Sequence, residues 1–374
     1  PRLLSSAASD VYKRQMTINL STPSNWPIHF NKPLIIAGPC SAESEEQMIA
    51  TGNALKSHKN ILFRAGVWKP RTRPNNFEGI GRIGLTWLKI VKEETGLATT
   101  TEVANAFHVE EALKQDVDVL WIGARTTVNP FAVQEIANAL KGVDIPLMIK
   151  NPLNPEVNLW VGAIERFADA GLTKLAAIHR GFFAYNNTKY RNIPQWQLAI
   201  ELRRRIPGIP MICDPSHIAG KSSLIYEVSQ KAIDMNYDGL MIETHINPEK
   251  ALSDNNQQVT PKQLNEILGK LVVRQAKIED PVFKSSLDQL RIEIDDLDYE
   301  LVDVLKRRMN VAEKIGLHKK ENKVTILQSN RWEELLKTRI QHGVDNGLTE
   351  EFMNKVLKAI HQESINRQTK VMNK

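Results

Sequence analysis

Eight short apolar runs, separated by stretches with helical patterning, occupy the first 250 residues of the chain. Each run ends in polar or charged residues, and none approaches the roughly 20 residues that a membrane span needs. The runs lie at 34–37, 61–63, 97–99, 119–122, 147–149, 175–178, 211–213 and 240–242. Buried strands that alternate with helices over about 250 residues are typical of a (β/α)8 (TIM) barrel. The sequence therefore predicts an α/β fold whose chemistry lies at the C-terminal ends of the strands.

A chain of 374 residues leaves room for a small second domain after the barrel. The last barrel helix is expected to begin at Thr260-Pro261, with threonine as N-cap and proline in the first turn. Glu279-Asp280-Pro281 then breaks the pattern, and Ser285-Ser286 offers a new N-cap. Met16 is a natural start, so we interpret the preceding segment as a non-native leader. The expected organisation is a leader at 1–15, a barrel domain at 16–274, a linker at 275–285 and a helical domain at 286–374.

The helical domain begins with an apolar heptad pattern, which predicts one long helix. Such a helix is over about 40 Å long at about 1.5 Å per residue, too long for the short helices that follow to cover. We therefore expect its apolar seam to be buried against a second copy of the chain, in an intertwined all-α dimer. The seam residues are Leu287, Leu290, Ile294, Leu297, Leu301, Val304, Val311 and Ile315.

Composition restricts the environment and the partners. The two cysteines, Cys40 and Cys213, make no disulfide framework, which favours a reducing compartment such as the cytoplasm. The formal charge of +6 is spread along the chain, with no arginine-rich tail. Small anionic metabolites are thus the expected partners, and neither nucleic acid nor a membrane is expected.

Four potential metal ligands follow the first, seventh and eighth strands of the predicted barrel. Strands one and eight adjoin in a closed barrel, so these side chains can converge on one cation. A thiolate, an imidazole and two carboxylates suit a divalent transition metal of borderline softness, with Mn²⁺ favoured among several acceptable ions. The alternative is that the cysteine only packs and that Asp214-Pro215 is only a turn. The candidate ligands are Cys40, His217, Glu243 and Asp254.

Cationic side chains follow the second, fourth, fifth and sixth strands. A ring of arginines and lysines around a barrel mouth repels itself unless anions bind there, and arginine binds phosphate and carboxylate with two hydrogen bonds. A solvated charged rim is the alternative for any one of them. The pattern predicts phosphate-bearing substrates. The residues are Arg64, Lys69, Arg71, Arg125, Lys150 and Arg180.

Five motifs across residues 30–270 resemble type I 3-deoxy-D-arabino-heptulosonate 7-phosphate synthases, in particular the beta subgroup that includes fusions to chorismate mutase. They are Gly38-Pro39-Cys40-Ser41, Lys69-Pro70-Arg71-Thr72, Gly123-Ala124-Arg125, Asp214-Pro215-Ser216-His217 and Lys250-Ala251-Leu252-Ser253-Asp254. A related family makes an octulosonate phosphate with the same barrel, so an aldolase acting on arabinose 5-phosphate stays an alternative.

The resemblance implies metal-dependent condensation of phosphoenolpyruvate with erythrose 4-phosphate. It assigns phosphoenolpyruvate to Arg125, Lys150 and Arg180, with Arg64 nearby. The aldose phosphate is assigned to Lys69, Arg71 and Thr72, and Lys69 is a candidate for protonating the new alkoxide.

In the helical domain, Arg308 continues the heptad at a core position. A buried guanidinium needs an anionic partner, either a core acid or a ligand. On the last helix, Ser364 and Gln368 continue the apolar stripe of Met353, Val356, Leu357 and Ile360. Polar residues from two helices thus enter one core, which indicates a site for a small charged ligand.

Residues 285–374 resemble the all-helical chorismate mutase, without gaps from Leu290 to Gln368. The resemblance implies rearrangement of chorismate, a dianion, to prephenate, with arginines holding the carboxylates and Lys319 and Gln368 stabilising the ether oxygen. The matching positions are Arg291 (from the partner chain), Arg308, Lys319, Arg331, Ser364 and Gln368.

Two positions depart from the mutase pattern. Trp332 stands where many members have a glutamate near the ring hydroxyl, and Gln328 stands where an aspartate is common. The expected function is therefore a bifunctional enzyme, and the alternative is a synthase whose helical domain only senses prephenate or chorismate.

Overall fold

The structure, a computed structural model, describes residues 18–28, 32–58, 60–70, 77–183, 185, 188–274 and 280–373. The expected leader and the first part of the expected linker lie outside the described residues, as do Arg71 and Thr72. The chain divides into two compact units, Pro1–Ala276 and Lys277–Lys374, which are treated separately below.

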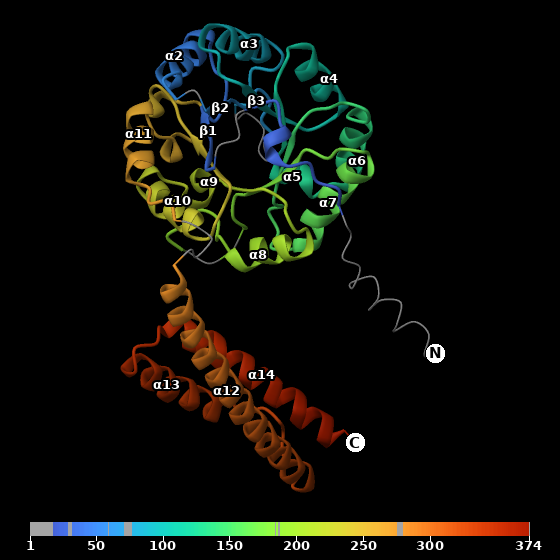
Figure 1. Cartoon of the computed structure of the whole chain (residues 1–374). Coiled ribbons are helices and arrows are strands. Elements are labelled where there is room, and N and C mark those ends of the chain that lie inside the picture. Colours follow the sequence, from blue (N-terminus) through green and yellow to red (C-terminus); the bar gives the residue numbers. More distant parts are fainter. Residues whose placement is uncertain are drawn as a thin grey trace. The chain divides into compact units, whose positions relative to one another are not determined.

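Eight parallel strands close into a barrel in sequence order, because β1 pairs with both β2 and β8 (Figure 1). The (β/α)8 prediction is thus confirmed. The strands are β1 (Leu34–Gly38), β2 (Ile61–Arg64), β3 (Thr99–Val103), β4 (Val119–Ile122), β5 (Leu147–Lys150), β6 (Leu175–His179), β7 (Met211–Cys213) and β8 (Gly239–Glu243).

Helices surround the strands on the outside of the barrel (Figure 1). The α11 helix begins after Thr260, as expected, and Thr260 and Gln263 form a reciprocal capping box there. The helices are α2 (Glu45–Leu55), α3 (Ile83–Thr95), α4 (Ala106–Lys114), α5 (Ala124–Thr127), α6 (Pro130–Ala139), α7 (Val157–Asp169), α8 (Trp196–Arg205), α9 (Pro215–Ala219), α10 (Ile225–Asp234) and α11 (Pro261–Lys270). Short 3-10 turns lie at Pro23–Asn25, Ser222–Leu224, Pro248–Lys250 and Asn255–Gln257.

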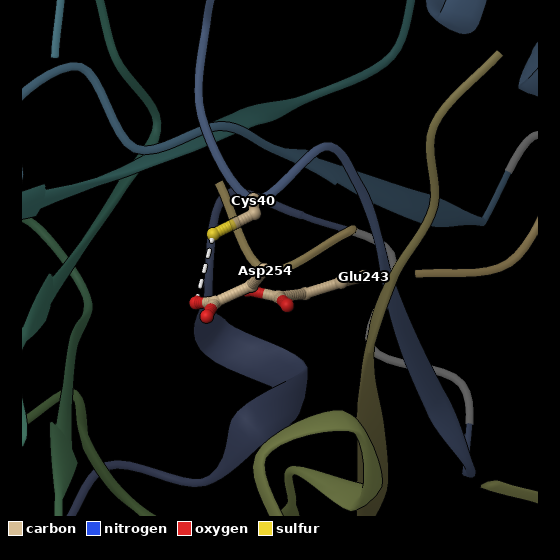
Figure 2. A group of neighbouring side chains, drawn as sticks. All are labelled: Cys40, Glu243 and Asp254. Atoms are coloured by element: carbon tan, nitrogen blue, oxygen red, sulfur yellow. Dashed lines mark hydrogen bonds between the residues drawn. The ribbon is translucent and has the colours of Figure 1, made fainter. Parts of the chain in front are cut away.

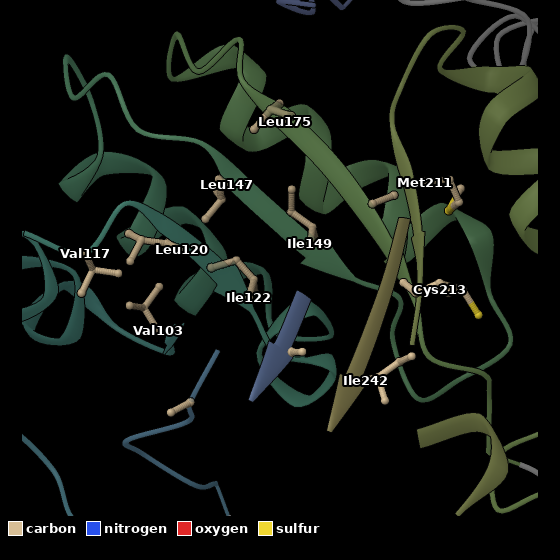
Figure 3. Close-up of a cluster of buried hydrophobic side chains, with 14 of the residues drawn as sticks. Val103, Val117, Leu120, Ile122, Leu147, Ile149, Leu175, Met211, Cys213 and Ile242 are labelled. Atoms are coloured by element: carbon tan, nitrogen blue, oxygen red, sulfur yellow. The ribbon is translucent and has the colours of Figure 1, made fainter. Parts of the chain in front are cut away.

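Alternate strand residues form two apolar layers, as the two-residue period of a strand requires. One layer fills the barrel interior and includes Ile36, Trp121 and Met241, with Trp26 packed against it from the N-terminal segment. The other lies between the strands and the helices. Figure 3 shows part of this outer layer, in which Ile122 and Ile149 extend from paired positions of β4 and β5. The two layers fix the strands, and the strands fix the residues that follow them.

The third strand lies further along the chain than the apolar run indicated. We expected it at 97–99, but β3 runs from Thr99 to Val103. Its threonines are β-branched and suit a strand, and the barrel buries them although they are polar. The shift places Glu102 near the C-terminal end of β3.

The second unit has three helices, α12 (Pro281–Glu321), α13 (Ser329–Asp345) and α14 (Glu350–Met372). The first begins at Pro281, and not at Ser285-Ser286 as expected, because the Asp280 side chain accepts hydrogen bonds from the backbone N–H groups of Val282 and Phe283. At about 1.5 Å per residue, its 41 residues span about 60 Å. The α14 helix packs against both of the others.

No helix in the described ranges combines the length and the apolar character that crossing a membrane requires.

Candidate active sites of the barrel and the helical unit

Three strand ends, those of β1, β7 and β8, bring the four predicted metal ligands to the C-terminal mouth of the barrel. Cys40 follows β1 by two residues, Glu243 ends β8, and Asp254 lies in the segment after β8. Gly38 permits the close approach of β1 to β2, because a Cβ there would lie 2.1 Å from the Arg64 carbonyl oxygen and its φ is +144°. This backbone places Cys40 beside β8.

Cys40, Glu243 and Asp254 point toward one another (Figure 2), and their ligand atoms all lie within 4.8 Å of each other. The Cys40 thiol donates to Asp254 Oδ2 at 3.4 Å. Glu243 Oε1 is buried and accepts no hydrogen bond, and the nearest cation, Arg64 Nη2, is 3.4 Å away. A buried carboxylate oxygen without a hydrogen bond in such a cluster suits a cation.

His217, the fourth predicted ligand, lies beside this cluster but outside its closest group. Its Nδ1 atom is 2.9 Å from Asp214 Oδ2, and its Nε2 atom is 3.9 Å from Glu243 Oε1. A carboxylate on one ring nitrogen fixes the imidazole orientation and leaves the other nitrogen facing Glu243.

The charges of the cluster suit a metal as well. Burial, followed by the charges of Glu243 and Asp254, raises the pKa of the Cys40 thiol to about 12. Burial by itself would also raise the pKa of Asp254, but His217 and Arg191 hold it below its usual value. The carboxylates are therefore ionised at neutral pH. The cluster combines one soft sulfur donor with hard oxygen donors, and this set of ligands fits a divalent transition metal.

Lys69 and Arg64 lie against the same cluster. The Lys69 ammonium donates to the Cys40 carbonyl oxygen, and its Nζ atom is 3.0 Å from Cys40 Sγ. Arg64 is fully buried, donates to the Cys40 carbonyl oxygen and lies 4.9 Å from the centre of the Trp121 ring. Its Nε and Nη1 atoms are buried without hydrogen-bond partners. Both cations thus lie against the cluster of Cys40, Glu243 and Asp254.

One cavity in the barrel mouth brings together cations from several strand ends. Lys150, at the end of β5, donates to Asp214 Oδ2 at 2.8 Å. Both residues are buried, and their charges neutralise each other. The cavity is lined by Lys69, Pro70, Glu102, Gly123, Ala124, Arg125, Lys150, Leu153, Arg180, Arg191, His217 and Asp254.

Lys69, Arg125 and Arg180 are the cavity cations without a carboxylate partner among the described residues. Arg180 donates to Asn192 Oδ1 at 2.8 Å, and burial lowers its pKa to about 10, with Arg125 and Arg191 adding repulsion. The charges of Asp214 and Asp254 offset this repulsion in part, and the remaining positive charge in the cavity favours the binding of an anion.

Three charged residues of the barrel mouth had no role predicted from the sequence. Glu102 was missed because β3 was placed too early, and it accepts a hydrogen bond from Trp121 Nε1 at 3.2 Å. Asp214 lies in a motif that the sequence marked, but it had no assigned role; it directly follows β7 and accepts hydrogen bonds from Lys150 and from the backbone N–H of His217. Arg191 pairs with Asp254 at 2.9 Å from a long loop, where no sequence pattern marked it.

The helical unit contains a second cationic cluster. Arg308 on α12 donates to the Ser364 hydroxyl on α14 at 2.5 Å, and Lys319 donates to the Ile326 carbonyl oxygen at 2.5 Å. In the described part of the chain, neither cation has a carboxylate within ion-pair distance. The core acid considered as the alternative partner of Arg308 is therefore not found there.

Gln368 joins this cluster because α12 and α14 approach closely at a glycine. A Cβ on Gly316 would lie 3.0 Å from Gln368 Cα and 2.7 Å from Val371 Cγ2. Gln368 Oε1 is buried and has no hydrogen-bond partner. The structure thus brings together Arg308, Lys319, Ser364 and Gln368.

Arg291 and Arg331, the other predicted ligand residues of this unit, are exposed. Arg291 pairs with Asp288 at 3.0 Å and Arg331 pairs with Glu334 at 2.7 Å, each along its own helix. Exposed pairs of this kind are weak and easily exchanged for a ligand.

Comparison with known families matches both units. Residues 29–279 match the DAHP synthetase I family, and residues 290–369 match chorismate mutase type II.

Individual relatives match the barrel. The phospho-2-dehydro-3-deoxyheptonate aldolase of Thermotoga maritima is 29% identical over 246 residues, which cover 66% of this chain and 70% of the relative. Its crystal structure has a TM-score of 0.58 at 27% identity and covers 64% of this chain and 68% of that chain. A 2-dehydro-3-deoxyphosphooctonate aldolase of Variovorax paradoxus is 29% identical over 289 residues, 67% of this chain and 95% of the relative.

Proposed function

Because this chain belongs to the DAHP synthetase I family and carries a chorismate mutase type II domain, we propose that it is bifunctional. The barrel condenses phosphoenolpyruvate with erythrose 4-phosphate to 3-deoxy-D-arabino-heptulosonate 7-phosphate and phosphate. The helical unit rearranges chorismate to prephenate. One observation carries the proposal: each candidate site holds cations without carboxylate partners among the described residues. They are Lys69, Arg125 and Arg180 in the barrel, and Arg308 and Lys319 in the helical unit.

The metal dependence of the barrel rests on the donor set. Cys40, Glu243 and Asp254, with His217 as the neighbouring imidazole, would hold a divalent ion, Mn²⁺ being our first choice. Such an ion supplies Lewis acidity toward an aldehyde carbonyl. Asp214 orients His217 for this role, and Arg191 orients Asp254.

The barrel cations bind and orient phosphoenolpyruvate. Arg125 and Arg180 balance the charges of its phosphate and carboxylate groups. The ion pair with Asp214 holds Lys150 in position. These groups also stabilise the charge that develops as phosphate departs. Lys69 lies between the cations and Cys40, where its ammonium can protonate the alkoxide that forms when the aldehyde is attacked. Arg71 and Thr72 remain the candidates for the aldose phosphate.

The helical unit needs no acid, base or nucleophile for a pericyclic rearrangement. Arg308 and Arg331, together with Arg291 of a second copy, fix the two carboxylates of chorismate in a reactive conformer. Lys319 and Gln368 stabilise the ether oxygen as negative charge develops there. Ser364 holds Arg308 in position, since its hydroxyl accepts the hydrogen bond from the guanidinium.

A second aldose phosphate is the competing proposal for the barrel, because several relatives are octulosonate aldolases at 25–29% identity. The rate of phosphoenolpyruvate consumption with erythrose 4-phosphate and with arabinose 5-phosphate separates the two. A preference for arabinose 5-phosphate would overturn the heptulosonate assignment.

Reciprocal single substitutions test the two activities in one chain. Cys40→Ala should abolish metal-dependent heptulosonate formation while chorismate consumption, followed by ultraviolet absorbance, continues. Arg308→Ala should reduce chorismate consumption by at least about a thousandfold, because it removes a half-buried cation that the dianion needs, while the synthase continues. Full synthase activity of Cys40→Ala with added Mn²⁺ would contradict the ligand assignment. A folded wild-type chain that leaves chorismate unchanged would contradict the mutase.

A further inference from the structure

Two aromatic side chains of the helical unit lie flat against each other. The rings of Trp332 on α13 and His361 on α14 are stacked with centroids 3.7 Å apart and planes within 11° of parallel. Both side chains are half-buried. The stack fixes the plane of the imidazole, so the directions of its two ring nitrogens are fixed as well.

His361 lies on the ligand-facing side of α14. Ser364 and Gln368 follow it at spacings of three and seven residues, which puts all three on one face of the helix. The charges of Arg308 and Lys319, both on α12, act on the imidazole strongly enough to lower its pKa in addition to burial. His361 therefore belongs to the same cluster as the proposed mutase residues, although the sequence pattern did not mark it.

The ring nitrogens of His361 have no polar partner among the described residues. Neither ring nitrogen makes a hydrogen bond or an ion pair with a described residue. Because burial and the two cations keep the imidazole neutral at physiological pH, it offers one N–H donor and one nitrogen acceptor. Such a ring can share a hydrogen bond with a hydroxyl in either direction.

We propose that His361, oriented by Trp332, is a substrate-binding residue that contacts the ring hydroxyl of chorismate. The inference rests on the proposed mutase function and proceeds by elimination. The arginines balance the carboxylates, and Lys319 with Gln368 serves the ether oxygen. The ring hydroxyl is then the substrate group without a partner. Among the described residues of the cluster, His361 is a polar side chain without a hydrogen bond that has no other assigned role.

In this assignment, Trp332 orients His361 toward the substrate. A carboxylate at position 332 could accept from the hydroxyl directly, whereas an indole cannot accept a hydrogen bond in its plane. The stack on His361 replaces that acceptor with an imidazole nitrogen from the next helix. The hydroxyl contact is therefore kept by a pair of residues from α13 and α14.

A comparison of two substrates tests the contact in the full-length chain. His361→Phe keeps a flat ring on Trp332 but removes both nitrogens, and His361→Gln keeps a donor and an acceptor. We expect His361→Phe to lower kcat/KM for chorismate about tenfold, the effect of one lost hydrogen bond. For 4-deoxychorismate, which lacks the ring hydroxyl, wild type and His361→Phe should differ by less than twofold. His361→Gln should recover part of the loss with chorismate.

Several results would overturn the proposal. An equal loss with both substrates would mean that His361 only supports the fold, and the thermal unfolding of each variant is measured to detect this. No loss with chorismate would mean that the imidazole does not touch the substrate. If wild type converts neither substrate, the proposed mutase function is wrong, and this result does not itself test His361. Calorimetric titration with prephenate then tests whether His361 contacts the ligand. Equal prephenate affinity of wild type and His361→Phe, or no binding by wild type, would then overturn the His361 contact.

Discussion

Buried charged residues in the barrel mouth are balanced in pairs, and this balance explains their ionisation states. Lys150 and His217 both lie against Asp214, so the pKa of this carboxyl stays well below its usual value although burial opposes ionisation. Arg64 lies against Glu243 in the same way. Lys69, Arg125 and Arg180 have no carboxylate partner among the described residues, and a substrate anion can balance their charge.

His179 provides a residue-scale prediction for stability. It is fully buried, with Nδ1 at 2.9 Å from the Tyr237 hydroxyl and Nε2 at 2.6 Å from the Pro194 carbonyl oxygen. Burial lowers its pKa to about 4. Because the unfolded chain binds this proton near pH 6.5, stability is complete above that pH and falls as the pH drops toward 4. The total loss is about 3 kcal/mol.

Urea unfolding followed by tryptophan fluorescence between pH 5 and 7.5 checks this prediction. His179→Asn should be less stable than wild type at pH 7.5, and its free energy of unfolding should fall less steeply below pH 6.5. His342→Asn, at an exposed position, is the matched control and should keep the wild-type slope. Parallel curves for His179→Asn and wild type would contradict the assignment.

At the scale of elements, the long helix α12 has one buried face and one exposed apolar face. Met309, Ala312 and Gly316 are buried, and Gly316 lies against α14. The heptad seam lies elsewhere on the helix, and Leu297 and Leu301 are 57% and 55% exposed. A row of exposed leucines on one helix is an apolar surface that favours association, so the intertwined dimer stays a prediction with this surface as its support.

Leu297→Lys tests the seam. In a symmetric dimer each substitution occurs twice, and losing the burial of two leucines costs at least about 3 kcal/mol, or about a hundredfold in the dimer dissociation constant. Sedimentation velocity at micromolar concentration should therefore show monomers. Chorismate turnover should fall with them, because Arg291 would no longer reach a partner. Asp298→Lys, one residue off the seam, should stay dimeric; a dimeric Leu297→Lys would refute the seam.

At the scale of the whole molecule, two units with different ligands share one chain. Such an arrangement permits regulation if ligand binding to one unit changes the substrate affinity of the other. The alternative function, a helical sensor, differs from the bifunctional proposal only in lacking chorismate turnover. Both are compatible with a cationic site at Arg308 and Lys319.

Prephenate is the inhibitor that we expect, since the helical unit would bind it as a product. Saturating prephenate should lower heptulosonate formation between about five- and a hundredfold, the usual range of coupling between sites. Arg308→Ala should remove the effect. Coupling in binding is reciprocal, so phosphoenolpyruvate should weaken prephenate binding by the same factor that prephenate weakens phosphoenolpyruvate binding. Unchanged synthase rates with bound prephenate would refute the coupling.

The sequence by itself determined the barrel and the identity of most residues at its mouth. Apolar runs of three or four residues that alternate with helical stretches are typical of buried parallel strands, and the C-terminal ends of parallel strands share one edge. For this reason the order of strands along the chain was enough to group Cys40, Glu243 and Asp254 at one site. The heptad likewise predicted the long helix, although Asp280 rather than a later serine caps it.

Only the tertiary structure decided which charges neutralise each other and which remain free. Pairing depends on side chains that are distant in sequence, such as Arg191 with Asp254 and Lys150 with Asp214, and no local pattern encodes it. The polar strand β3 was likewise recognisable only in the barrel, because its buried threonines lack an apolar signature. Local periodicity therefore specified the elements, whereas long-range packing specified the partners of the charged groups.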